Sequence, residues 1–201
     1  MVKPVIGITM GDPAGIGPEI VIKALLNREL YKICIPVVIG DLSFLQYTAK
    51  RLKLNILMKS ISSPSCSSGG NEIIEIVDLK NVNLKRKQIG KVSEEAGKAS
   101  IEYIVKATKY ALDSELDAIV TAPINKESIQ QAGSPHIGHT ELLGALTFTE
   151  KPMTMFLISG VRIFFLTRHV PLRKAIEDVI KPKIEDAVIK IDAFLRKMEI
   201  E

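Results

Sequence analysis

The chain has 201 residues, of which 46% are hydrophobic, and 27 Lys and Arg against 23 Asp and Glu give a formal net charge of +4. This mild, scattered positive charge disfavours a nucleic-acid-binding protein and is compatible with an anionic small substrate. We expect no signal peptide and no membrane span, because no apolar run has the required length. Cys34 and Cys66 form no metal or disulfide pattern, which favours a reducing cytoplasm.

Strand-like and helix-like runs alternate through the first 121 residues. A strand at 5–10 leads through a glycine-rich turn into a helix at 18–27. Beyond it we expect strands at 36–39, 55–59, 73–77 and 118–121, helices at 43–52 and 93–112, and a mobile loop at 61–71. Such alternation predicts an α/β fold with a parallel, doubly wound sheet. Ligands gather at the carboxyl ends of such strands, where polar clusters follow Met10, Ile39 and Val120.

The pattern changes after the last of these strands. A short helix at 140–146 precedes two strand-like runs, 153–158 and 161–166, and only Ser159-Gly160 separates the two runs. A two-residue connection predicts an antiparallel hairpin. Helices at 171–180 and 184–197 follow, interrupted by Pro182. The change falls within 122–138, so we expect one α/β domain at 1–125 and the start of a second, with some antiparallel strands, at 126–201.

The last predicted helix has an apolar face that needs a partner. Ile184, Val188, Ile191, Leu195 and Met198 recur at helical spacing, and the chain stops three residues later. We interpret this as the end of a fragment. The alternative is that the face packs back on its own domain or across a dimer.

The first glycine-rich turn is the most informative motif. Gly11, Gly15 and Gly17 have the spacing G-x-x-x-G-x-G, and Pro18 stands where a first helical residue should be. This spacing is neither the dinucleotide fingerprint G-x-G-x-x-G nor a P-loop. A strand-to-helix turn of this kind lets a ligand approach the backbone closely. The alternative is a turn that only lets the helix pack on its strand.

Two of the three histidines stand in promising positions. His139 lies in Gly-His-Thr-Glu at a helix start, where Thr140 can cap the helix and exposed amides can hold an anion. His169 follows a strand, where it could bind a metal or titrate near neutral pH. A lone histidine can equally be structural, and one histidine does not make a metal site.

Charged candidates carry weaker signals. Lys126, Arg168 and Arg173 could bind phosphate or carboxylate groups, although each alone is as well explained as a surface charge. Asp41 follows the second strand and resembles the ribose-binding acid of a Rossmann unit. Without the matching glycine spacing, that indication is weak.

Six sequence blocks occur together in one order: MGDPAGIGPE, VIGD, GKVSEEAGKAS, TAPINKES, GHTELL and RHVPLR. In order and approximate spacing they resemble the 4-hydroxythreonine-4-phosphate dehydrogenases of vitamin B6 biosynthesis. The resemblance covers essentially the whole chain. It implies an isocitrate/isopropylmalate dehydrogenase-like fold, in which two α/β domains flank a cleft, and a cytoplasmic homodimer.

The resemblance also implies the chemistry. The family uses NAD, or NADP, to oxidise the secondary alcohol of 4-phosphooxy-L-threonine, and the keto acid formed then loses CO₂. A divalent metal such as zinc, magnesium or cobalt acts as Lewis acid. Carried over to this chain, His139 and Thr140 contact the phosphorylated substrate and His169 is one of three metal-binding histidines. His136 matches no functional position, and no residue is assigned to catalysis or cofactor binding.

The chain departs from the family pattern in one respect. The family's N-P-H-A-G-E and Y-H-D-Q-G blocks, which carry the other two metal histidines, do not occur here. We therefore expect a truncated or split enzyme whose 201 residues alone have no dehydrogenase activity. Two alternatives stay open. One is a sister enzyme acting on D-threonate or D-erythronate 4-phosphate, and the other is a non-catalytic fragment that is inactive or works only with a partner chain.

Overall fold

The computed structural model describes residues 3–70, 72–83, 89–150, 152–168 and 170–198, in two compact units, Met1–Glu150 and Lys151–Glu201. The segment 126–150 falls within the first of these units. The expected domain boundary between residues 125 and 126 stays a prediction. No helix in the described ranges combines the length and apolar character needed to cross a membrane.

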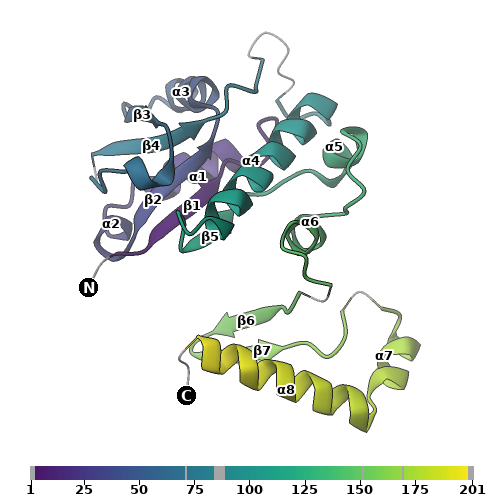
Figure 1. Cartoon of the computed structure of the whole chain (residues 1–201). Coiled ribbons are helices and arrows are strands. Elements are labelled where there is room, and N and C mark those ends of the chain that lie inside the picture. The colour runs from purple at the N-terminus through teal and green to yellow at the C-terminus, as the bar shows by residue number, and fades with distance from the viewer. Residues whose placement is uncertain (1–2, 71, 84–88, 151, 169, 199–201) are drawn as a thin grey trace. The chain divides into compact units, whose positions relative to one another are not determined.

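The first unit is built on a five-stranded parallel sheet (Figure 1). Its strand order is β3-β4-β2-β1-β5. The strands are β1 (Val5–Thr9), β2 (Ile35–Gly40), β3 (Leu57–Ile61), β4 (Ile73–Asp78) and β5 (Ala118–Thr121). The predicted parallel sheet is therefore confirmed. Because β1 lies between β2 and β5, the loops that follow these three strands meet at one edge.

Helices lie between these strands and after the last of them. They are α1 (Gly17–Leu25), α2 (Leu30–Ile33), α3 (Leu42–Arg51), the 3₁₀ turn η1 (Pro64–Cys66), α4 (Glu94–Leu112), α5 (Lys126–Gln131) and α6 (His139–Leu146). The chain steps one way across the sheet through α1 and α3 and back through α4. Right-handed crossovers therefore put α4 on the opposite face, where it lies across β1, β2 and β5 (Figure 1).

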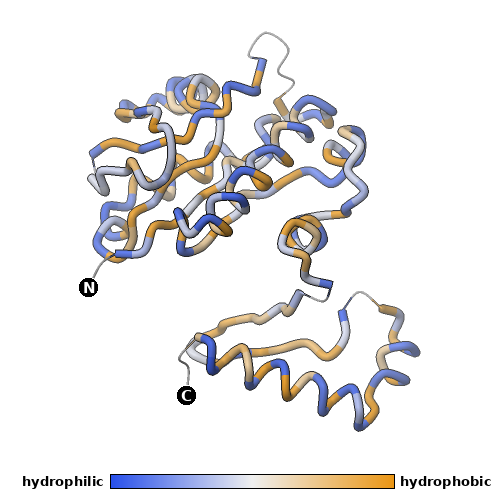
Figure 2. The backbone as a smooth tube through the Cα atoms, viewed as in Figure 1, coloured by the Kyte–Doolittle hydropathy of each residue, from blue (hydrophilic) through white to orange (hydrophobic). Residues whose placement is uncertain are grey.

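Burial on both faces explains the composition of the central strands, which are coloured as hydrophobic in Figure 2. Val37, Val38 and Ile39 of β2 are all fully buried. A strand covered on both faces has no polar side, so its sequence is continuously apolar rather than alternating. Tyr103 of α4 and Phe44 of α3 are the largest fully buried side chains of the core.

Three short elements are absent from the sequence expectation: α2, α5 and η1. The last lies in the segment 61–71, for which we expected a mobile loop. There the nearly buried carboxylate of Glu75 in β4 accepts hydrogen bonds from Ser67 and from the amide and hydroxyl of Ser68. These bonds give a serine-rich segment a defined local structure that its composition does not reveal.

The second unit contains the hairpin β6 (Met155–Ile158) and β7 (Val161–Phe164) and the helices α7 (Leu172–Asp178) and α8 (Lys181–Lys197). The two strands are antiparallel, as predicted. Ser159 and Gly160 both have positive φ, the geometry that a two-residue hairpin turn requires. Pro182 stands in the first turn of α8, where proline is tolerated, and so it begins this helix rather than interrupting one.

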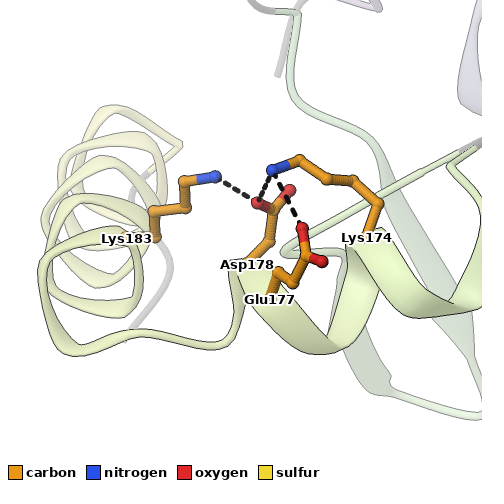
Figure 3. A network of polar contacts seen from close by, with 4 residues as sticks. All are labelled: Lys174, Glu177, Asp178 and Lys183. Atoms are coloured by element: carbon orange, nitrogen blue, oxygen red, sulfur yellow. Dashed lines mark hydrogen bonds and ion pairs between the residues drawn. The ribbon is translucent and has the colours of Figure 1, made fainter.

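Charged side chains join the two helices of this unit (Figure 3). Lys183 Nζ lies 2.5 Å from Asp178 Oδ1, and Lys174 Nζ lies 3.3 Å from the same oxygen. Lys174 also pairs with Glu177 at 3.6 Å. Because Lys183 belongs to α8 and Asp178 to α7, their pair fixes the turn between the helices.

Candidate functional site

The glycine-rich turn follows β1 and is tightly packed against the protein itself. A Cβ on Gly11, whose φ is +73°, would lie 2.5 Å from the Pro123 carbonyl oxygen. A Cβ on Gly17 would lie 2.4 Å from the Met10 carbonyl oxygen. Close packing of the turn therefore explains these two glycines, whichever ligand the edge binds. Gly15 has only ordinary contacts, to Asp12 at 3.5 Å.

Asp12 is the buried acid of this turn, with only 4% of the residue exposed. Its carboxylate accepts a hydrogen bond from the Ala14 amide at 2.7 Å and another from the Ser128 hydroxyl. Its own amide donates to the Pro123 carbonyl at 2.9 Å. Burial raises the pKa of Asp12 above its usual value, and the hydrogen bonds only partly offset that effect.

The segment after β5 supplies the second wall of the site. Asn125 caps α5, because its side-chain oxygen accepts from the Ser128 amide at 2.9 Å. Lys126, the first residue of α5, is exposed at this edge. Its ammonium is therefore accessible to an anionic ligand, as the sequence suggested.

The third wall is the start of α6. This helix begins at His139, one residue earlier than expected, and its N-cap is Gly138 in an extended conformation with no side-chain cap. Thr140 therefore lies in the first turn and does not cap the helix. Because a glycine cap supplies no side-chain acceptor, amides of the first turn are left for an anionic ligand.

His139 joins α6 to the segment after β5. Its ring hydrogen-bonds to the backbone of Ala122, and its Nε2 is buried without a partner among the described residues. Burial lowers the pKa of His139, and the bond to Ala122 opposes this shift. Near neutral pH the ring is accordingly neutral.

These contacts bring three sequence blocks to one edge of the sheet. Asp12 bonds to Pro123, and His139 bonds to Ala122, the neighbouring residue. The polar clusters expected after Met10 and Val120 therefore lie together at this edge, and the start of α6 lies beside them. A separate cavity of about 170 Å³ opens elsewhere on the glycine-rich turn, lined among others by Pro13, Phe44 and Arg51 and by no residue after Ile89.

Asp41 has a structural explanation instead of a ribose-binding one. It is 1% exposed and caps α3, accepting from the Phe44 amide at 2.8 Å and the Ser43 hydroxyl at 2.6 Å. Its second oxygen accepts from the Val82 amide at 3.0 Å. Both carboxylate oxygens are therefore occupied within the fold.

The predicted metal ligand His169 lies outside the described residues. Within the described ranges, no group of three or more His, Cys, Asp and Glu side chains could hold a metal ion. The described donor set therefore does not complete a metal centre by itself. Arg168 is half-buried and Arg173 exposed, both in the second unit.

The sequence reasoning missed the link between Asp12 and Ser128. These residues are 116 positions apart, and neither stands in a spacing that predicts a pair. Each had a local signal: an acid in a strand-end turn, and a serine three residues after a capping asparagine. Only the neighbouring positions of β1 and β5 in the sheet bring the two together.

A parallel α/β sheet with a glycine-rich turn and polar loops at its carboxyl edge defines a ligand-binding protein of the doubly wound class. The family described as "Pyridoxal phosphate biosynthetic protein PdxA" matches residues 32–201. The chain belongs to the PdxA family.

Relatives and solved structures agree with this assignment. A Clostridium botulinum relative named "Putative D-threonate 4-phosphate dehydrogenase" is 45% identical over 199 residues, covering 99% of this chain and 60% of the relative. A relative of the same name from Halalkalibacterium halodurans is 42% identical with the same coverage. The chain therefore spans about 60% of the length of these curated relatives.

The crystal structure of a 4-hydroxythreonine-4-phosphate dehydrogenase from Burkholderia phymatum superposes with a TM-score of 0.90 at 32% identity, covering 98% of this chain and 59% of that chain. The corresponding Klebsiella pneumoniae structure gives 0.89 at 33% identity, with coverage of 97% and 59%. The fold of the chain is thus that of this group of dehydrogenases over the residues compared.

Proposed function

We propose that the chain forms part of an NAD-dependent dehydrogenase that oxidises a four-carbon hydroxy acid 4-phosphate, with decarboxylation of the product. The observation that carries this proposal is the start of α6. There a buried, unpartnered Nε2 of His139 stands at a helix N-terminus that has no side-chain cap. Family membership and the names of the relatives support it.

In this proposal, the residues of the chain hold the phosphate end of the substrate. The first-turn amides of α6 donate to phosphate oxygens, and Thr140 adds a hydroxyl donor. His139 contributes Nε2, and a bound dianion favours the protonated ring because an opposite charge raises the pKa of a base. Held in this way, the substrate presents its secondary alcohol in one orientation. NAD, when bound, accepts the hydride from that carbon.

The identity values favour one substrate over the other. Relatives named for D-threonate 4-phosphate are 45% and 42% identical to this chain, whereas structures named for 4-hydroxythreonine 4-phosphate are 32% and 33% identical. We therefore place D-threonate 4-phosphate first and 4-phosphooxy-L-threonine second. The third substrate to be compared is D-erythronate 4-phosphate, the C2 epimer of D-threonate 4-phosphate.

Our proposals for the metal site and for the quaternary structure concern residues that the structure does not describe. His169 would supply one ligand to a divalent metal, and two more would come from the part of the relatives that this chain does not cover. We propose the same two-domain, homodimeric organisation as in isocitrate and isopropylmalate dehydrogenases. The alternative, a non-catalytic polypeptide, predicts no activity however the chain is completed.

A chimera tests the proposal. The uncovered part of the Clostridium botulinum relative is joined to this chain, and NAD reduction is measured with the three 4-phosphates. We expect activity, greatest with D-threonate 4-phosphate, and a rise in KM of at least about tenfold for His139→Ala, as loss of a charge-assisted hydrogen bond implies. His136→Ala is the matched control and should change little. A folded but inactive chimera, or one indifferent to His139→Ala, contradicts the proposal.

A further inference from the structure

We infer that Asp12 is a positioning residue, which fixes the segment 122–128 so that the Ala122 carbonyl orients the His139 ring. The inference deepens the proposed function, because it takes His139 as a substrate-positioning residue. Two hydrogen bonds of Asp12, one near each end of the segment 122–128, support it. The amide of Asp12 bonds to Pro123 and its carboxylate to Ser128.

The first bond controls the near end of the segment. Asp12 donates its amide to the Pro123 carbonyl at 2.9 Å, and the adjacent carbonyl of Ala122 accepts the His139 ring. The two carbonyls belong to consecutive peptide units that meet at the Cα of Pro123. Each unit is planar, and the proline ring restricts the φ angle between them, so a displacement of the Pro123 carbonyl also turns the Ala122 carbonyl.

The second bond controls the far end. Ser128 is fully buried, and its hydroxyl donates to Asp12 while accepting from the Ser93 amide at 3.2 Å. Gly97 of α4 lies against the Ser128 carbonyl so closely that a Cβ there would stand 2.0 Å away. The start of α5 thus has no room to move toward α4. With both ends fixed, the four-residue connection between β5 and α5 has one available course.

A carboxylate suits this position better than an amide. Asp12 accepts from the Ala14 amide and from Ser128, which leaves a lone pair on the Ser128 oxygen for the Ser93 amide. An asparagine would turn an NH₂ group toward either Ala14 or Ser128. If it faces Ser128, that hydroxyl receives two donors and its own proton loses its buried acceptor.

The test reads His139 directly, in the 201-residue chain and without any substrate. Imidazole nitrogen and carbon signals are recorded by NMR for wild type, Asp12→Asn and Ser128→Ala, and the three histidines of the chain allow assignment by substitution. Thr108→Ala is the control. Thr108 is as buried as Ser128 and bonds to the Ile104 carbonyl, about 20 Å farther along α4 than Ser93.

We expect both test variants to shift the His139 signals and leave those of His136 unchanged. Hydrogen exchange of the Ala122 and Ser128 amides should quicken by about tenfold, as local loosening implies. Thr108→Ala should do neither, even where it lowers the Tm. If Asp12→Asn fails to fold, Ser128→Ala decides alone.

Unchanged His139 signals in folded Ser128→Ala would overturn the inference, as would equal shifts in Thr108→Ala. Both results concern only the position of the ring, so they are independent of activity. An inactive chimera contradicts the proposed function and leaves the positioning role to be read from these spectra.

Discussion

The two units of the chain differ in how completely they bury their apolar side chains. The first covers its sheet on both faces and contains a continuous core, with Tyr103, Phe44 and Met10 almost wholly buried. In the second, none of the described residues is buried, and Phe156, Leu157 and Val188 are each more than half exposed. Helices on both faces of a sheet complete a core by themselves, whereas a two-stranded hairpin beside two helices does not.

The difference predicts where a lost aromatic ring matters. Phe44→Ala empties a fully buried position, and we expect a loss of about 3–5 kcal/mol in the free energy of unfolding. Phe156→Ala should cost under about 1 kcal/mol, because its ring is half exposed and makes an edge-to-face contact with Phe165, with 4.7 Å between the ring centroids. Urea unfolding of both variants checks this. Equal losses would show that the second unit is as tightly packed as the first.

A single methyl group tests the packing between α4 and α5. Gly97→Ala would improve intrinsic helix propensity by about 1 kcal/mol in an open helix. Here the new Cβ would stand 2.0 Å from the Ser128 carbonyl oxygen and 2.2 Å from its carbon, so we expect a net loss of about 1–3 kcal/mol. Gly70→Ala is the control, since its Cβ meets only the Ser68 hydroxyl, at 3.5 Å. An unchanged Tm for Gly97→Ala contradicts this close packing.

The elements of the chain also differ in how far their local sequences reveal them. The parallel sheet, the cap at Ser93 and the hairpin turn at Ser159-Gly160 follow from local patterns of period, capping and turn chemistry. Helix α5 does not, because its six residues contain a single apolar side chain, Ile129. The local cap from Asn125 and the burial of Ile129 stabilise this helix, and the burial depends on α4 being in place.

The candidate site shows the same limit. Residues 138–140 were predicted at a helix start, and they are there. The bond from His139 to Ala122, the burial of Asp12 and its link to Ser128 could not be predicted, because each joins segments whose proximity is set by the order of the strands. Sequence patterns identify groups that can bind. Topology decides which of them meet.

The titration of His139 predicts how the first unit responds to pH. Burial lowers its pKa below the ordinary value of 6.5, so the unfolded chain binds the proton more tightly. The corresponding stability is present above pH 6.5 and is lost as pH falls through the lowered pKa. We expect His139→Gln to reduce the change in the free energy of unfolding between pH 7.5 and 5, which urea unfolding measures at each pH. His136→Gln is the control, and an equal flattening there contradicts the prediction.

The smallest effect belongs to the second unit, at the ion pair between α7 and α8. The bond from Lys183 is the main reason why the pKa of Asp178 lies below its usual value of 3.8. The stability that this ion pair gives the folded chain is present above pH 3.8 and is lost as pH falls through the lowered pKa of Asp178. Lys183→Met should raise the pKa of Asp178 and reduce stability slightly at neutral pH, with the difference vanishing in acid. Added salt should weaken the effect, because both groups are near solvent.

The control for this change lies on the same helix. Lys190 pairs with Asp186 at 2.5 Å, one turn away within α8, and it joins no other element. Lys190→Met therefore removes an equivalent charge without touching the turn between α7 and α8. NMR titration of Asp178, with hydrogen exchange at residues 178–183, separates the two variants. If the two variants alter hydrogen exchange at residues 178–183 equally, the loss of stability comes from the change in net charge, and the pair between Lys183 and Asp178 does not fix the turn.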